Sequence, residues 1–420
     1  MQALRGTQDI LPQDAYKWNY MEKNIRDLCG RYGYGEIRTP MFEATELFQR
    51  GIGDTTDVVT KEMYTFTDRG GRSITLRPEN TASAVRAYLE HKLYGDQQVH
   101  KFFYIGSMFR YDRPQAGRYR EFHQFGVEVM GADSPAADAE VISLAYTLFQ
   151  SLGLKDLVLH INSIGCGKCR PAYRQRLIDY FKEGKEDLCH DCQERLEKNP
   201  LRVLDCKEDG AKKLVKDAPN ITDYLCEECQ KKFDAVKQYL TALGIPYEVD
   251  PRLVRGLDYY TNTAFEIQYT PLGAQSAICG GGRYDGLVEE VGGPHTPSVG
   301  FAVGLERLLL ALEMQKLIPE PVKPGHVYIA ALGEDAIAEG MKIQQELRND
   351  GIRADLDLQG RSLKGQMKQA GKTGADYTVI IGSDELDRKE ASVKSMAEGT
   401  QASISFDQVA AYVKEKENKK

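Results

Sequence analysis

Four runs in the first three quarters of the chain alternate apolar and polar residues in the way that strands do. They are KFFYIGSMFRY at 101–111, EFHQFGVEVMG at 121–131, LVLHINSIG at 157–165 and AFEIQYT at 264–270. Hairpin-sized or irregular connections separate them, which favours neighbouring strands that run in opposite directions. The pattern predicts an antiparallel sheet with helices packed on it, an α+β fold.

The region from about 171 to 243 has a different pattern, because helical spacing and many charges replace the alternation. RQRLIDYFKEGKEDL and ECQKKFDAVKQYLTAL carry its clearest helical periodicity. We therefore expect a helical insertion within a first domain that spans residues 1–322.

A stretch with three prolines, LIPEPVKPG at 317–325, predicts an extended connector to a second domain at 325–420. Strand-like and helix-like runs alternate beyond it, which predicts a small α/β domain with a parallel or mixed sheet, a hairpin and a final helix. The expected strands are HVYIAAL at 326–332, IRADLDL at 352–358, ADYTVIIG at 375–382, SVKSM at 392–396 and QASISF at 401–406, and the expected helices are DAIAEGMKIQQELRNDG at 335–351, SLKGQMKQAGKTG at 362–374 and DQVAAYVKEKENKK at 407–420.

Composition narrows the class of protein. The chain has 420 residues, of which 41% are hydrophobic and 28% charged, enough apolar content for a large core. Neither a long apolar run nor a signal-like start is present, so we expect a cytoplasmic protein without a membrane span. A formal net charge of −7 argues against a general basic surface for nucleic acid. RSLKGQMKQAGK at 361–372 has basic residues and no carboxylate, which fits either a local nucleic-acid-binding patch or a solvated face.

The connection between the strand-like runs at 101–111 and 121–131 concentrates positive charge. It also contains a proline and a glycine, as loops do, and clustered arginines suit phosphate groups. Its arginines are Arg110, Arg113, Arg118 and Arg120.

Alternation along 121–131 places Gln124 and Glu128 on one face of the strand and apolar residues on the other. This pattern fits an exposed hairpin whose polar residues face water, or a ligand site. Recurrence favours the second, because four other stretches also place Arg, Glu or Tyr among glycines, which let a backbone approach a ligand closely. They are LRPENTA at 76–82, RGLDYYTNTAFE at 255–266, GGGRYDGL at 280–287 and SVGFAVGLERLLL at 298–310.

Arg307 falls in the first turn of the helix predicted within the last of these stretches. A guanidinium group there faces an unfavourable helix dipole, which an anionic ligand would relieve. The alternative is an arginine that reaches out to solvent.

Together these segments resemble the signatures of class II aminoacyl-tRNA synthetases. YGYGEIRTPMFE at 32–43, MFRYDRPQAGRYREFHQFGVEVMG at 108–131 and SVGFAVGLERLLL look like motifs 1, 2 and 3 of that class. RGLDYYTNTAFE, GGGRYDGL and the opening RGTQDILP are similar to signatures of the bacterial-type histidyl-tRNA synthetase family. The C-terminal α/β domain resembles that family's anticodon-binding domain, so the resemblance covers nearly the whole chain.

The resemblance implies a class II catalytic sheet and a homodimer formed with the help of the segment that ends near Pro40. It also implies ATP-dependent activation of L-histidine to histidyl-adenylate, with Mg²⁺ on the outer phosphates, and transfer to tRNA(His) with release of AMP and pyrophosphate. By this resemblance Arg110, Arg118 and Arg307 bind ATP, Arg255 and Arg110 are the catalytic residues, Glu79, Thr81 and Gln124 hold the α-amino group of histidine, Glu128 and Tyr260 read its imidazole nitrogens, and Tyr284 helps to close the pocket.

Seven of the nine cysteines lie between positions 166 and 229, mostly in Cys-x-x-Cys pairs. Reduced thiols or metal ligands fit a cytoplasmic chain better than disulfides do. Cys166, Cys169, Cys189 and Cys192 have the spacing of a structural zinc site that staples a region with little core of its own. Plain thiols are the alternative, a third pair leaves the ligand set open, and the resemblance adds nothing to this choice.

Two other classes of protein fit part of the sequence. A regulatory subunit of ATP phosphoribosyltransferase resembles the synthetase catalytic fold without charging tRNA, but such proteins lack the anticodon-binding domain. A zinc-stapled nucleic-acid-binding protein would leave the glycine-flanked stretches without a role. The sequence therefore predicts an enzyme of the histidyl-tRNA synthetase family.

Overall fold

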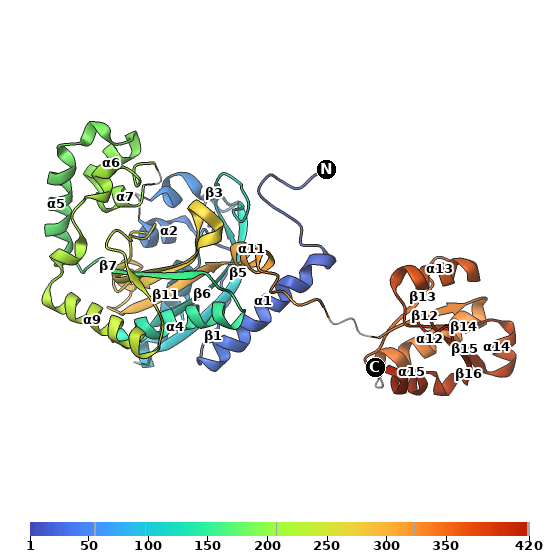
Figure 1. The fold of residues 1–420 in the computed structure, drawn as a ribbon. Helices are drawn as coiled ribbons and strands as arrows, with labels where there is room; N and C mark the ends of the chain where they lie inside the picture. The colour runs from blue at the N-terminus through green and yellow to red at the C-terminus, as the bar shows by residue number, and fades with distance from the viewer. Residues whose placement is uncertain (54–55, 97, 207, 322–324, 418–420) are drawn as a thin grey trace. The chain divides into compact units, whose positions relative to one another are not determined.

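The chain divides between Pro319 and Glu320 into two units (Figure 1). The computed structural model describes residues 1–53, 56–96, 98–206, 208–321 and 325–417. Residues 322–324 of the predicted connector and residues 418–420 of the predicted final helix lie outside this part of the chain. Among the described residues, every helix is too short or too polar to span a lipid bilayer.

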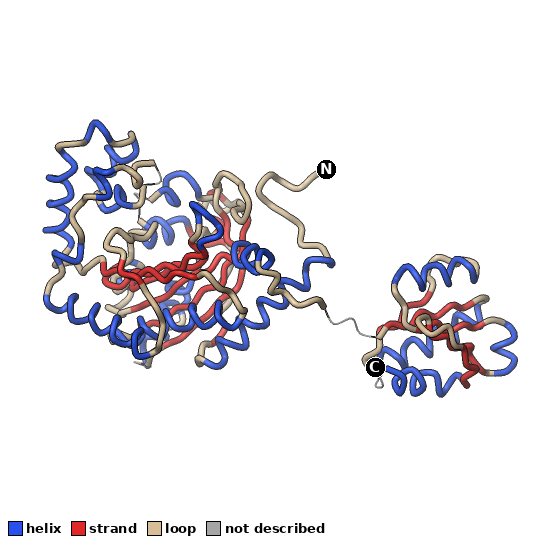
Figure 2. The backbone as a smooth tube through the Cα atoms, viewed as in Figure 1, coloured by secondary structure: helices blue, strands red, loops and turns tan. Residues whose placement is uncertain are grey.

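The large sheet of the first unit forms from the alternating runs (Figure 2). Its inner neighbours pair antiparallel, and each two-residue edge strand pairs in parallel with the next strand. The predicted antiparallel sheet is therefore confirmed. In spatial order the strands are β1 (Gly35–Glu36), β5 (His100–Phe109), β6 (Glu121–Met130), β11 (Ser298–Gly304), β10 (Ala277–Arg283), β9 (Thr261–Tyr269), β7 (Leu157–Ser163) and β8 (Glu248–Val249).

Strand β6 lies between β5 and β11 and shows how the two faces of the sheet differ. Glu128 pairs with Phe102 on β5 and with Gly300 on β11. Phe125 and Val127 point to the other face and are completely buried in the core. Glu128 is itself only 1% exposed, so the predicted alternation is confirmed, and an exposed hairpin is the wrong interpretation.

Four helices cover the face of the sheet that carries Phe125, and α4 and α9 run side by side across it (Figure 1). Helix α4 begins at Pro135, after Ser134 accepts a hydrogen bond from a first-turn amide. Each large apolar side chain buried in this layer contributes roughly 1.5–3 kcal/mol. The opposite face is left for polar residues. The four helices are α1 (Pro12–Arg31), α4 (Pro135–Ser151), α9 (Glu227–Ala242) and α11 (Leu305–Met314).

The charged region between β7 and β8 forms a group of helices, of which α5, α6 and α7 lie at the upper left in Figure 1. Tyr173, Leu177 and Phe181 are completely buried within it. One apolar cluster joins these side chains to Tyr260 and Tyr284, which lie next to the ends of β9 and β10. The region therefore shares its core with the rest of the first unit, which agrees with the expectation of little core of its own. Before α9 the elements are α5 (Arg170–Lys182), η3 (Lys185–Asp187), α6 (His190–Lys198), α7 (Leu201–Leu204), α8 (Lys213–Lys216) and η4 (Ile221–Tyr224).

A small antiparallel sheet in the order β2-β4-β3 and several short helices complete the first unit. They are β2 (Phe42–Ala44), α2 (Thr45–Ile52), η1 (Val58–Glu62), β3 (Tyr64–Thr67), β4 (Ser73–Leu76), α3 (Thr81–Glu90), η2 (Leu93–Asp96), η5 (Thr270–Gln275) and α10 (Leu287–Glu290).

The second unit has a mixed sheet in the order β13-β12-β14-β15-β16, with parallel pairs around β12 and antiparallel pairs beyond β14. The predicted α/β pattern is confirmed, and α14 is a helix that the sequence did not predict. The elements are β12 (His326–Ala331), α12 (Glu334–Asn349), β13 (Arg353–Leu356), α13 (Leu363–Thr373), β14 (Tyr377–Ile381), α14 (Ser383–Arg388), β15 (Glu390–Ser395), β16 (Gln401–Ser405), η6 (Phe406–Gln408) and α15 (Val409–Glu417).

Candidate active site

A cavity of about 480 Å³ lies on the face of the large sheet that carries Gln124, and a second of about 490 Å³ adjoins it. Arg110, Arg118, Gln124 and Arg255 line both cavities. The two therefore form one continuous space that is large enough for a small-molecule ligand.

The residues predicted from the sequence converge on this space. Glu128 and Tyr284 join it through hydrogen bonds rather than through its walls. The predicted residues that line the first cavity are Glu79, Thr81, Arg110, Arg118, Gln124, Arg255 and Tyr260. Arg307 lines the second cavity.

Glu128 on β6 is a buried carboxylate surrounded by hydroxyl groups. The Thr81 hydroxyl donates to its Oε1 at 2.7 Å, the Tyr104 hydroxyl donates to the same atom at 3.2 Å, and the Tyr284 hydroxyl donates to Oε2. A Cβ atom at Gly300 would collide with Oε2, so this position must be glycine for Glu128 to fit. Burial raises the pKa of Glu128 to about 8, although the hydroxyl donors act in the opposite direction.

Glu79 is a second buried carboxylate, at the start of α3. Its Oε2 accepts the backbone N–H of Thr81 at 2.7 Å, and its Oε1 accepts that of Ala82 at 3.0 Å. Burial raises the pKa of Glu79, and the charge of Glu79 in turn raises that of Glu128. Two acidic groups held in this way favour a ligand with cationic or N–H donor groups.

Arg255 lies over β10, where Gly280 leaves room for its guanidinium group; a Cβ atom at Gly280 would overlap it. Its Nη1 donates to Glu266 Oε2 at 2.6 Å. Burial alone would lower the pKa of Arg255, but the charge of Glu266 and weaker contributions from its other neighbours together outweigh it, and the pKa is raised. Within the described residues, Arg255 Nε and Gln124 Oε1 are buried atoms without a hydrogen-bond partner, as expected where a ligand completes the site.

Three further arginines surround the outer part of the space. Arg110 Nε donates to the carbonyl oxygen of Pro78 at 2.8 Å, and Arg118 pairs with Asp112. Arg307 donates through Nη1 to the carbonyl oxygen of Ala277 at 2.8 Å. Burial and repulsion from Arg118 both lower the pKa of Arg307, so an anion placed between them would be stabilised.

Tyr104 and the helical insertion contribute residues that sequence reasoning missed. Tyr104 reads as one apolar member of a strand, yet its hydroxyl reaches Glu128 because its partner on β6 is Gly126. Asp205 and Cys206 of the insertion also line the first cavity. No periodicity marks them, because they come from a loop that meets the sheet only in the folded chain.

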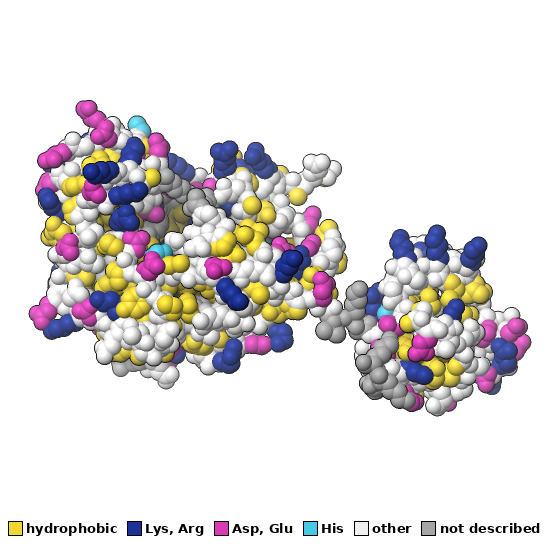
Figure 3. All heavy atoms as spheres, in the orientation of Figure 1, with side chains coloured by type: hydrophobic (Ala, Val, Ile, Leu, Met, Phe, Trp, Pro, Cys, Tyr) yellow, Lys and Arg dark blue, Asp and Glu magenta, His cyan; other side chains and the backbone are white. Residues whose placement is uncertain are grey.

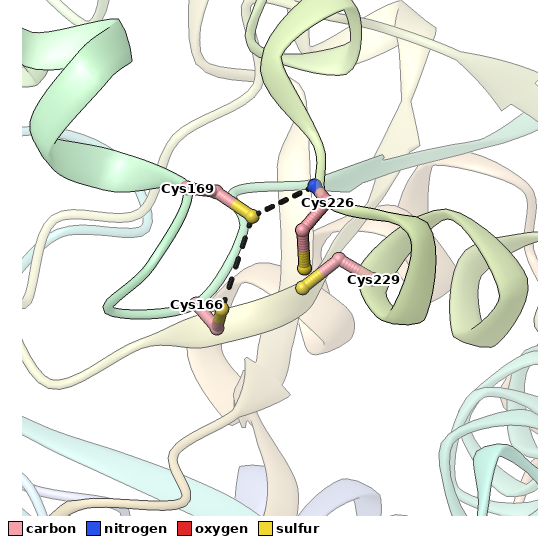
Figure 4. Close-up of side chains that lie close together, drawn as sticks. All are labelled: Cys166, Cys169, Cys226 and Cys229. Carbon is pink, nitrogen blue, oxygen red and sulfur yellow. Dashed lines mark hydrogen bonds between the residues drawn. The ribbon is translucent and has the colours of Figure 1, made fainter.

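The cysteines do not assemble as predicted. Cys166 and Cys169 lie apart from the second pair, and group with Cys226 and Cys229 at the start of α9 (Figure 4). The other group is Cys189, Cys192, Cys206 and Asp209. The predicted set of Cys166, Cys169, Cys189 and Cys192 is therefore wrong, because chain spacing identifies each pair but not the loop that folds against it.

Comparisons with known proteins identify the family of the chain. The family profile described as "Histidyl-tRNA synthetase" matches residues 6–308, and that described as "Anticodon binding domain" matches residues 326–416. A protein of Pelotomaculum thermopropionicum named histidine–tRNA ligase is 58% identical over 413 residues, which cover 98% of this chain and 97% of that protein.

Two solved structures are also similar to the chain. The crystal structure of apo S. aureus histidyl-tRNA synthetase is 44% identical, with a TM-score of 0.82 over 98% of this chain and 99% of its own. A Bacillus halodurans structure described as an ATP phosphoribosyltransferase regulatory subunit/histidyl-tRNA synthetase is 20% identical, with a TM-score of 0.65 over 91% of this chain and 98% of its own. The second likeness concerns the fold alone.

Proposed function

The chain belongs to the histidyl-tRNA synthetase family and joins histidine to tRNA at the expense of ATP. We propose that histidine and ATP react in the space around Glu128 and Arg255. The observation that carries this proposal is the close placement of two kinds of charge. Glu79 lines the first cavity, Arg307 lines the second, and Arg110, Arg118 and Arg255 line both. The end near Glu79 is called the carboxylate side and the end near Arg307 the arginine side. Such a space matches an amino acid with donor groups joined to a triphosphate.

Histidine would occupy the carboxylate side. Glu79, Thr81 and Gln124 would hold its α-amino group, and Gln124 Oε1 has no partner among the described residues. Glu128 and Tyr260 would meet the two imidazole nitrogens, one as an acceptor and one through its hydroxyl. An apolar side chain of the same shape would leave these buried groups without partners, which supports specificity for histidine. Tyr284 would close the pocket through its hydrogen bond to Glu128.

ATP would occupy the arginine side. Arg110 would bind the α-phosphate, and Arg118 and Arg307 the outer phosphates, because guanidinium groups pair with phosphate oxygens in a bidentate manner. Mg²⁺, when bound, neutralises charge on the outer phosphates. The carboxylates of Asp112 and Glu266 at this cavity are oxygen donors of the kind that Mg²⁺ prefers.

Arg255 would act on the reacting atoms. The histidine carboxylate attacks the α-phosphorus, the bond to the bridging oxygen breaks, and pyrophosphate leaves with that electron pair. Arg255 would stabilise the negative charge that grows at the α-phosphate. The histidyl group then passes from the adenylate to a ribose hydroxyl of tRNA, and AMP is released.

Pyrophosphate exchange into ATP tests this proposal, run with each of the twenty amino acids in turn. Exchange that requires histidine supports both the reaction and the pocket. Exchange with another amino acid would overturn the pocket assignment. No exchange in folded protein would favour a regulatory subunit of ATP phosphoribosyltransferase instead. The similarity of the chain to ligases over nearly its full length argues against that alternative.

Helix α13 of the second unit would contribute to tRNA binding in the domain proposed for residues 325–420. Lys364, Lys368 and Lys372 are exposed and four residues apart, so they share one side of the helix. Figure 3 shows basic side chains gathered over α13. Reversing the three charges should weaken tRNA charging and leave pyrophosphate exchange unchanged, and Lys342→Glu on α12 is the control. A parallel loss of both activities would contradict this surface.

The assembly and setting of the protein complete the proposal. The protein would act in the cytoplasm. The segment at 32–43 would help to form a homodimer, and sedimentation of the purified chain would test whether it is a dimer. Structural zinc would bind in the helical insertion, at the two groups of four ligands rather than at the set predicted from spacing.

A further inference from the structure

Two groups of side chains in the helical insertion each place four ligand atoms within 4.8 Å of one another. The first group joins the turn at Cys166 and Cys169 to the start of α9, and the second joins two segments within residues 189–209. Cys166, Cys169, Cys226 and Cys229 form the first centre (Figure 4), and Cys189, Cys192, Cys206 and Asp209 form the second.

Sulfur–sulfur distances in both centres fit a single tetrahedral ion. Cys166 Sγ and Cys169 Sγ are 3.8 Å apart, as are Cys189 Sγ and Cys206 Sγ. A disulfide would hold its sulfurs at about 2.05 Å. Zinc–sulfur bonds of about 2.3 Å in a tetrahedron give edges of about 3.8 Å. The spacing therefore matches zinc thiolates and not a disulfide.

Backbone amides also point at the sulfur atoms. Cys226 N donates to Cys169 Sγ at 3.1 Å, and Lys168 N donates to Cys166 Sγ at 3.4 Å in the first centre. Asp209 N donates to Cys206 Sγ at 3.4 Å in the second. Donors of this kind stabilise thiolates and orient them toward a metal ion.

Asp209 gives the second centre its distinct character. Its side chain is completely buried, its Oδ2 accepts the backbone N–H of Cys189 at 2.9 Å, and its Oδ1 lies 2.7 Å from Lys212 Nζ. A buried carboxylate among three thiolates is unfavourable without cations. Lys212 supplies one positive charge, and a divalent ion would supply two more.

The second centre also adjoins the catalytic cavity. The segment that it closes, from Cys189 to Asp209, contains α6 and α7, and Cys206 lines the cavity. Arg202 on α7 donates through Nη1 to the carbonyl oxygen of Arg255 at 3.2 Å. Asn199 Nδ2 donates to Asp258 Oδ1 at 3.0 Å, so two hydrogen bonds join this segment to the loop that carries Arg255.

We propose that the chain binds two structural zinc ions, a four-cysteine ion at the first centre and a three-cysteine, one-aspartate ion at the second, and that the second ion positions Arg255 through α7. Arg202 is in this scheme a positioning residue. The positioning role rests on the proposed function of the cavity, whereas the two metal sites do not.

Metal content of the full-length chain tests the sites directly. Protein purified under reducing conditions, reconstituted with zinc and desalted should hold two zinc ions per chain by mass spectrometry. Cys229→Ser and Cys192→Ser should each hold one, and the control Cys29→Ser, in α1 and outside both centres, should hold two. Zinc no higher than the buffer blank would overturn both sites. One ion in the unmodified chain would contradict the proposal of two sites. Loss of both ions in either variant would contradict the independence of the two sites.

Alkylation of the native protein gives a second measurement that needs no variant. Cys166, Cys189 and Cys226 are partly exposed and would react as free thiols. With zinc bound they should resist iodoacetamide, and a chelator should make all three react, as peptide mass spectrometry would show. Equal reaction with and without the chelator would overturn the proposal.

Kinetics separate the positioning role from simple support of the fold. A small displacement of Arg255 should lower the kcat of pyrophosphate exchange by about tenfold in Cys192→Ser while the KM for ATP changes by less than about twofold. Addition of zinc should rescue Cys192→His, because imidazole is also a zinc ligand. An unchanged kcat in zinc-depleted Cys192→Ser would overturn the positioning role. Absence of exchange in the unmodified chain would instead count against the proposed function and leave the metal count to decide the sites.

Discussion

Glu128→Gln should make histidine binding weaker and less dependent on pH. With a pKa of about 8, about one Glu128 in ten is ionised near pH 7 and about nine in ten near pH 9. Histidine N–H donors favour the ionised form, so binding below the pKa must remove a proton. The affinity contributed by this residue should therefore rise about tenfold between these pH values.

The magnitude of the loss follows from the same contacts. Gln keeps the shape of Glu128 but removes a hydrogen bond to a charged group, worth about 2 kcal/mol, or about thirtyfold in Kd. That full difference should appear near pH 9. Near pH 7 the unmodified protein already loses about tenfold to protonation, so the variant should be only about threefold weaker.

Isothermal titration calorimetry with histidine measures both values. The imidazole of the ligand titrates in both proteins, so the ratio of their dissociation constants isolates Glu128. Glu248→Gln on edge strand β8 is the matched control, since this carboxylate is 69% exposed. A ratio that is the same at both pH values would refute the reasoning, as would a variant that binds histidine normally.

Two further predictions concern Arg255, and a third concerns the buried ion pair between Arg283 and Asp138. Arg255→His should lower the kcat of pyrophosphate exchange by about a hundredfold with little change in the KM for ATP, because the guanidinium group acts on developing charge; equal changes in both would contradict this. Gly280→Ala should also lower kcat, since its methyl group would displace Arg255, whereas Gly286→Ala, with no atom nearer than 3.9 Å to the added Cβ, should not. Arg283→Ala should destabilise the protein by about 3–5 kcal/mol, measured by urea unfolding, because it leaves Asp138 buried without its partner; unchanged stability would contradict a structural role.

The central part of the fold could be predicted from local pattern. Alternation in β5 and β6 identified the antiparallel pair, and it placed Gln124 and Glu128 on one face because a strand has a period of two. The helix that carries Arg307 was predicted for the same kind of reason, since its apolar residues have helical spacing. Both are properties of a single element, so the sequence of that element suffices.

The rest depends on which distant segments meet. Cys166 and Cys169 could be recognised as a pair, but their partners are Cys226 and Cys229, and only the fold of the insertion brings the segment before α5 to the start of α9. Tyr104 was overlooked because an aromatic residue in a strand is usually part of a core. The hydrogen bond from its hydroxyl group to Glu128 becomes evident only when the opposite position is known to be glycine.

The selectivity of the pocket for its ligand and the cost of the pocket to the stability of the fold arise from the same feature, its buried carboxylates. In the proposed pocket, Glu128 would discriminate among ligands because it is removed from water, and removal from water is also the main cause of its raised pKa. A more exposed carboxylate would cost less stability, but water would then satisfy it whichever amino acid was bound. Both carboxylates are therefore buried, and three hydroxyl groups donate hydrogen bonds to Glu128. The ligand would supply the remaining hydrogen bonds. An amino acid without those donors leaves the whole cost unrelieved, which is the physical basis for rejecting it.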